Sequence, residues 1–161
     1  MTGFYLSSYL PLIEHWDGTA WTVVPLVPPE VLLNVDATLR AITFLSAYNV
    51  WAVGGGGLIL HFTARGWTAE ASNIPLPANG FTLSGVAARS SADGWTVGSA
   101  AGGRTVTAHF VGTQWTAVPG PNPGTVSNAL YGVARLRGGP TVAVGSRDDG
   151  HGPAPLIARA A

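Results

Sequence analysis

The feature that most constrains this chain is a set of three short anchors that recur together along it. A strand-like core reads NVWAVG at residues 49–54, DGWTVG at 93–98 and PTVAVG at 140–145. A segment ending in an aromatic residue reads EHW at 14–16, LHF at 60–62 and AHF at 108–110, and a tryptophan segment (AWTVV, GWTAE, QWTAV) follows each copy. The step is 46 residues from Trp21 to Trp67 and 48 from Trp67 to Trp115. Repeats of this length are typical of units that bury their apolar faces only against one another, so we expect an array.

Within one unit, the pattern predicts four short strands joined by turns. The apolar runs are rich in Val, Ile, Trp, Thr and Phe and are bounded by Gly, Asn, Asp and Pro, which is typical of strands and turns. No segment shows a sustained helical period. Runs such as VWAV are apolar at every position, which indicates sheets covered on both faces. The sequence therefore predicts an all-β fold of about three four-stranded antiparallel blades of a β-propeller, with thirteen strands in all.

The same residues resemble a known family. An apolar strand ending in VGG, an aromatic-ended strand, a Trp-containing strand and then prolines resemble the kelch-type propeller repeat. Still more similar are bacterial repeats of the form DVWAVG followed by LIEHWNGTSWSVVPSP, which LIEHWDGTAWTVVP at residues 12–25 follows almost position by position. The resemblance covers residues 12–159 and departs in the last unit, where Val142 replaces the strand Trp and Arg159 ends the third strand. It implies propeller architecture more than function, since such folds host enzymes, lectins and interaction platforms.

The order of the predicted strands divides the chain into a leader, residues 1–11, and a three-blade half-propeller with staggered ends, residues 12–161. The leader aromatics Phe4, Tyr5 and Tyr9 are expected either to add a strand or cap or to belong to a partly ordered end. Propellers close with about four to eight blades, so three blades leave two apolar faces uncovered. We therefore predict self-association, either of two chains into a six-bladed ring or of many into a filament. A piece of a longer propeller is the further alternative.

Composition excludes several classes of partner. Charged residues make up 10% of the chain, the net charge is zero, and the eight basic residues are all Arg. A neutral surface with few charges favours association, whereas nucleic-acid binding needs clustered positive charge and is not expected. There is no cysteine for a disulfide or a thiolate site. No apolar run reaches the ~18 residues of a membrane span, so no membrane partner is expected. The compartment stays open.

Histidine and tryptophan follow the repeat. His15, His61 and His109 occupy one repeat position, and equivalent positions in successive blades do not converge on one ion, so we expect a structural role and neither metal nor cofactor. The tryptophans of the second and fourth strands are expected to fill the space between blades: Trp51 and Trp95, and Trp21, Trp67 and Trp115.

One polar stretch, residues 145–153, stands outside the repeat. Loops between second and third strands emerge on one face of a propeller, which makes the charged residues of these loops the predicted ligand-binding patch. These residues are Arg104, Arg147, Asp148, Asp149 and His151. Two carboxylates are too few for a calcium site, and a solvated loop is the alternative interpretation. The glycines at 54–57 lack a following Lys-Ser/Thr and predict a turn, not a phosphate site.

No constellation of carboxylates or of Ser, His and Asp predicts catalysis, so we do not expect an enzyme. The sequence favours a non-enzymatic, self-assembling propeller module that acts as a scaffold or protein-binding platform. A carbohydrate-binding lectin that uses the loop face is the alternative.

Overall fold

The structure is a computed structural model that describes residues 11–25, 37–75, 80–136 and 138–160. Every regular element in these ranges is a β-strand, and none is a helix. The predicted all-β fold is therefore confirmed. Residues 1–10 of the predicted leader lie outside the described ranges.

The strands form four sheets that follow one another along the chain. The N-terminal hairpin consists of β1 (Glu14–Trp16) and β2 (Trp21–Val23). Sheet 1 contains β3 (Leu39–Ser46), β4 (Asn49–Gly54), β5 (Ile59–Thr63) and β6 (Gly66–Ala69). Sheet 2 contains β8 (Phe81–Ser90), β9 (Asp93–Ala100), β10 (Arg104–Val111) and β11 (Trp115–Ala117). Sheet 3 contains β12 (Ser127–Arg135), β13 (Thr141–Asp148) and β14 (Pro153–Ala160).

One strand was not predicted from the sequence. The two-residue β7 (Ser72–Asn73) lies in the connection after sheet 1 and pairs in parallel with β11, at the outer edge of sheet 2. The Asn73 Nδ2 atom also donates a hydrogen bond to Gln114 Oε1 at 2.9 Å. This connection therefore ties two consecutive sheets together. The thirteen predicted strands are all present beside it.

The pairing register repeats from sheet to sheet. His15 pairs with Thr22, His61 with Thr68 and His109 with Thr116. The next pair in each case joins two aromatic residues, as Phe62 joins Trp67 in sheet 1. The N-terminal hairpin thus has the register of the third and fourth strands of a complete sheet. It corresponds to the outer half of a blade.

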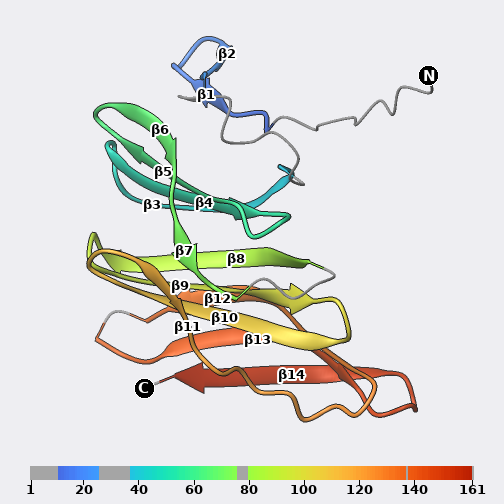
Figure 1. Ribbon diagram of the computed structural model, residues 1–161. Coiled ribbons are helices and arrows are strands. Elements are labelled where there is room, and N and C mark those ends of the chain that lie inside the picture. Colours follow the sequence, from blue (N-terminus) through green and yellow to red (C-terminus); the bar gives the residue numbers. More distant parts are fainter. Residues whose placement is uncertain (1–10, 26–36, 76–79, 137, 161) are drawn as a thin grey trace, which may run out of the picture.

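The sheets stack face to face along the chain, from the hairpin to β14, and their first strands β3, β8 and β12 lie side by side (Figure 1). Because consecutive units stack in this way, the core lies between the sheets. The largest cluster joins sheets 1 and 2, where Trp51 meets Trp115 edge to face with ring centroids 5.4 Å apart. Burying one such ring stabilises the fold by about 4–6 kcal/mol at ~25 cal/mol per Å². This blade-on-blade packing is what the repeat predicted.

Candidate interaction surfaces

The repeated histidine of sheet 1 is held inside the protein's own packing. The His61 imidazole stacks on Trp51 with centroids 3.8 Å apart and an interplanar angle of 3°. Its Nε2 atom lies 3.1 Å from Asn49 Oδ1, and its Nδ1 atom lies 3.5 Å from Glu70 Oε1. Burial lowers the pKa of His61, and the Glu70 carboxylate opposes that shift. This environment makes His61 a structural residue.

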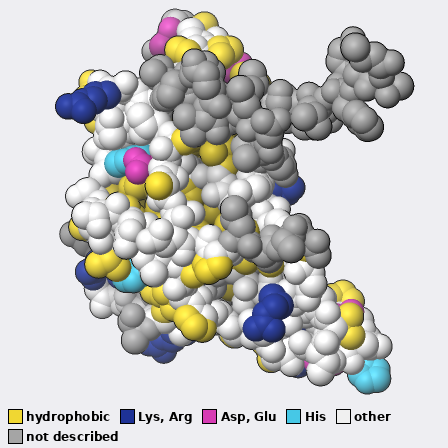
Figure 2. All heavy atoms as spheres, viewed as in Figure 1, with side chains coloured by type: hydrophobic (Ala, Val, Ile, Leu, Met, Phe, Trp, Pro, Cys, Tyr) yellow, Lys and Arg dark blue, Asp and Glu magenta, His cyan; other side chains and the backbone are white. Residues whose placement is uncertain are grey.

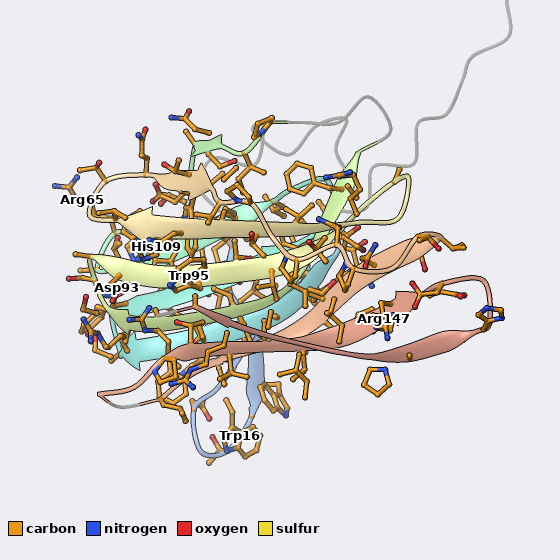
Figure 3. The ribbon with its side chains drawn as sticks, turned by 90° about the horizontal axis from the view of Figure 1, so that it is seen from below. Trp16, Arg65, Asp93, Trp95, His109 and Arg147 are labelled. Carbon is orange, nitrogen blue, oxygen red and sulfur yellow. The ribbon has the colours of Figure 1, made fainter. Side chains whose placement is uncertain are left out.

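Sheet 2 repeats the arrangement with a stronger acceptor. His109 stacks on Trp95 with centroids 4.4 Å apart, and its Nε2 atom lies 2.9 Å from Asp93 Oδ1. Asp93, Trp95 and His109 gather at one end of the sheets, whereas Arg147 lies at the opposite end (Figure 3). His61 and His109 thus both bond an Asn or Asp side chain at the start of the second strand. No group of three potential metal ligands occurs in the described part of the chain.

The predicted ligand-binding patch falls on two neighbouring loops. Arg147 and Asp148 end β13, and Asp149 and His151 lie in the turn before β14. Arg104 begins β10, next to the β9–β10 turn. That turn reaches sheet 3, because Gly103 O accepts a hydrogen bond from Asn128 N at 2.8 Å. The fold thus brings the two loops to the same end of adjacent sheets.

Both carboxylates of this patch already bind groups of the protein itself. Asp148 Oδ1 accepts hydrogen bonds from Gly150 N at 2.7 Å and from Gly152 N at 3.2 Å. Asp149 accepts a hydrogen bond from Thr125 N at 3.2 Å and forms an ion pair with Arg147. These contacts shape the β13–β14 turn. Arg104, Asp149 and His151 are the exposed members of the patch, and of these Asp149 is already paired with Arg147.

A stronger candidate surface lies at the N-terminal end of the stack. We call Trp16, Trp21 and Val23 the N-terminal end face. All three are exposed, and the centroids of the two indole rings lie 5.7 Å apart. The fourth-strand tryptophans occupy one repeat position but differ in exposure: 1% for Trp115, 4% for Trp67 and 65% for Trp21. Each buried ring is covered by the unit that precedes it. Figure 2 shows hydrophobic side chains on the surface of this end, at the top of the view.

The C-terminal end of the stack shows the matching pattern. We call Tyr131, Val144 and Ile157 the C-terminal end face; each is exposed on the outer side of sheet 3. Val53, Val97 and Val144 occupy one repeat position, and their exposures are 0%, 2% and 49%. In sheets 1 and 2, the sheet that follows along the chain covers this valine. Sequence reasoning predicted two uncovered faces, but not which residues of the last unit compose the second.

An apolar groove of about 460 Å³ separates the N-terminal hairpin from sheet 1. Ile13 and Val24 line it from the hairpin side, and Ile42, Phe44 and Val50 line it from sheet 1. Both Ile42 and Phe44 are largely exposed on β3. The hairpin therefore covers only the outer part of the sheet 1 face.

Repeating antiparallel sheets that stack face to face with their first strands adjacent define a protein of the β-propeller type. No protein-family model matches the sequence, and no curated protein does either. Among solved structures, the chain is similar to one described as YCF48 bound to D1 peptide, with a TM-score of 0.55 and 17% sequence identity. The match covers 76% of this chain and 42% of that one, so the chain spans less than half the length of that structure.

This similarity shows the fold alone. The predicted propeller-type fold is confirmed, and the kelch-type and DVWAVG-type repeats remain resemblances. Within the described ranges, no helix is long and apolar enough to cross a membrane.

Proposed function

We propose that this chain is a non-enzymatic propeller module that assembles head to tail with copies of itself and acts as a scaffold or protein-binding platform. The sequence predicted six blades for a ring of two chains, whereas a ring closed through the two end faces stacks all four sheets of each chain and contains eight. A filament is the open form. One observation carries the proposal: Trp21 and Val144 are exposed at repeat positions that are buried wherever a neighbouring sheet covers them.

The two end faces complement each other. Trp115 packs in one cluster with Val53 and Ile59 of the preceding sheet. Trp21 is the repeat equivalent of Trp115. On the other side, Val144 pairs with Ile157 as Val53 pairs with Ile59. A contact between the N-terminal end face of one chain and the C-terminal end face of another would therefore repeat the packing that already joins sheets 1 and 2.

Charge favours the same head-to-tail pairing. Glu14 is exposed beside Val23 on the N-terminal end face. Arg159 is exposed on β14, paired with Val142, at the C-terminal end. Opposite charges on the two faces attract, whereas joining two like faces would bring equal charges together. A contact between unlike faces closes into a ring when the rotation allows and otherwise continues as a filament.

The protein-binding part of the proposal has a separate basis. The similar structure YCF48 is described as bound to D1 peptide. For this chain, peptide or protein binding is proposed from the propeller-type fold, which hosts interaction platforms among its functions. The alternative, a lectin that uses the loop patch, would be favoured if a glycan array detected binding that His151→Ala abolished.

Single charge substitutions test the head-to-tail proposal. Trp21→Glu alters the N-terminal end face, and Ile157→Glu alters the C-terminal one. We expect native mass spectrometry to show assemblies for the wild type, monomers for each variant alone, and a one-to-one heterodimer when the two variants are mixed. Val111→Glu, at the exposed apolar residue that ends β10, is the matched control and should assemble like the wild type.

The mixing step distinguishes the possible contacts. If Ile157→Glu alone still forms dimers while Trp21→Glu does not, like faces meet and the head-to-tail contact is wrong. A wild-type chain that stays monomeric at all concentrations tested contradicts self-assembly altogether.

A further inference from the structure

The groove beside sheet 1 lies where another strand packs elsewhere in the protein. Ile42 on β3 and Val86 on β8 occupy one repeat position, since Ile42 pairs with Ala52 and Val86 with Thr96. Val86 is only 7% exposed because it packs in the cluster that contains Trp51 and Val53 of β4, whereas Ile42 is 64% exposed. In sheet 2, this position is buried by β4, which is the second strand of the preceding sheet. The groove therefore has the place and the apolar character to receive such a strand.

The edge of β1 points to the same occupant. In sheets 1 and 2 the third strand pairs with the second on one side and with the fourth on the other. Within the described ranges, β1 pairs with β2 alone. His15 has the register of His61 and His109, but within the described residues no second-strand aromatic ring stacks on it and no Asn or Asp side chain forms a hydrogen bond with it. An edge with unpaired N–H and C=O groups accepts a further strand readily.

The chain itself contains a segment that fits this edge. Residues 2–8 read TGFYLSS, and residues 93–99 of the second strand of sheet 2 read DGWTVGS. The glycine, the aromatic residue and the final serine fall at the same positions. Phe4 precedes His15 by 11 residues, between the 10 residues from Trp51 to His61 and the 14 from Trp95 to His109. The spacing therefore allows a hairpin of the same register with a short turn.

We propose that residues 2–8 bind in the groove as the second strand of the first blade, antiparallel to β1. Because side chains alternate along a strand, this register directs Phe4 and Leu6 toward sheet 1 and Tyr5 and Ser7 outward. Phe4 then stacks on His15 as Trp95 stacks on His109, and Leu6 covers Ile42. Tyr5 extends the apolar surface of the N-terminal end face.

This inference is independent of self-assembly, because it concerns contacts within one chain. It does not change the number of sheets. The N-terminal hairpin becomes a three-stranded sheet, and each chain still contributes four sheets, so that a closed pair contains eight. Eight blades is still within the range in which propellers close.

Cysteine pairs test the proposed register directly, since the full chain has no cysteine of its own. Leu6→Cys with Ile42→Cys places two thiols on facing sides, at the positions that Val53 and Val86 occupy between sheets 1 and 2. Tyr5→Cys with Ile42→Cys is the matched control, shifted by one residue to the opposite side of the strand. Both proteins are oxidised at a dilution where chains do not collide, and free thiols and chain mass are measured.

We expect both thiols to be lost within a single chain in the Leu6→Cys pair and both to remain free in the Tyr5→Cys pair. The proposal is overturned if both pairs oxidise to the same extent, or if neither pair oxidises. A covalent dimer from the Leu6→Cys pair also overturns it, because the strand would then come from another copy. Free thiols and chain mass are read on isolated chains, so a wild type that fails to assemble leaves this result unaffected.

Discussion

Arg135 of β12 reaches from sheet 3 to Asp93 of β9 in sheet 2, where Arg135 Nη2 lies 2.9 Å from Asp93 Oδ2. The second nitrogen, Nη1, donates a hydrogen bond to Asp93 Oδ1 at 3.1 Å. The same carboxylate has two further partners. Asp93 Oδ1 lies 2.9 Å from His109 Nε2, and Asp93 Oδ2 lies 3.3 Å from Arg89 Nε. Asp93 and Arg135 are both mostly buried. One carboxylate thus joins two consecutive sheets through charge.

Removing that carboxylate should destabilise the fold. Asp93→Ala leaves the buried Arg135 guanidinium without its counter-charge, and the Arg135 Nε atom already has no partner among the described residues. We expect the free energy of unfolding, measured by urea denaturation, to fall by about 2–4 kcal/mol. Asp149→Ala is the control: it breaks a more exposed ion pair and should cost below about 1 kcal/mol. Equal losses from the two variants would contradict this account.

The fourth-strand tryptophans should differ sharply in their contribution to the stability of one chain. Trp115→Ala removes a fully buried ring and should lower the free energy of unfolding by about 3–5 kcal/mol. Trp21→Ala removes an exposed ring at the same repeat position and should cost about 1 kcal/mol or less. Denaturation is measured at a dilution where the wild type is monomeric. A large loss for Trp21→Ala under that condition would mean that the ring is covered within a single chain.

A glycine ends the repeated second-strand core in each sheet, and a substitution can test whether a larger side chain is excluded there for a steric reason. A Cβ atom at Gly98 would lie 1.9 Å from Thr82 O, on the neighbouring first strand, where the pairing shifts between Leu83 and Gly85. A Cβ atom at Gly54 would meet the carbonyl of Thr38, just before β3, and one at Gly145 would meet the carbonyl of Ala129 in β12, in the same way. We expect Gly98→Ala to lower the free energy of unfolding by about 3 kcal/mol, because the backbone must shift.

Gly132→Ala is the matched control for that steric effect. A Cβ atom there meets only Val144 Cγ2, at 3.6 Å, which is an ordinary contact. The thermal midpoint of unfolding of the Gly132→Ala protein should stay close to that of the wild type. If the two alanine variants melt together, backbone crowding does not explain the repeated glycine.

His61 should make the folded protein less stable as the pH falls. Its pKa is lowered in the folded state, chiefly by burial. As pH falls below about 6.5, the ordinary value for histidine, the unfolded chain therefore binds a proton before the folded chain does, and the free energy of unfolding falls. Glu70→Gln should steepen this fall, because the Glu70 carboxylate opposes the shift.

Urea denaturation across a series of pH values measures that slope. His61→Gln, which removes the titrating imidazole, is the control and should flatten the slope. A slope that Glu70→Gln leaves unaltered would show that the carboxylate does not act on the His61 imidazole.

Much of the local structure follows from the repeat. The strand order, the turns and the pairing of His with Thr recur because each unit has the same short-range pattern of apolar residues and glycines. The roles of Trp51, Trp67 and Trp115 between sheets were predictable for the same reason. The bond from Asp93 to Arg135 was not, since the two residues are 42 positions apart and belong to different units. Neither was β7, which lies in a connection with no strand pattern of its own.

The sequence by itself determined that this chain is a series of β-sheet units with a common register, because alternation, turns and repeat length are local properties. Only the tertiary structure decided which copies of a repeated residue are buried. Trp21 and Trp115 stand in equivalent surroundings along the chain, yet a neighbouring sheet covers one and not the other. Burial depends on which surfaces meet in space, and the end units of a stack have one neighbour fewer than the units between them.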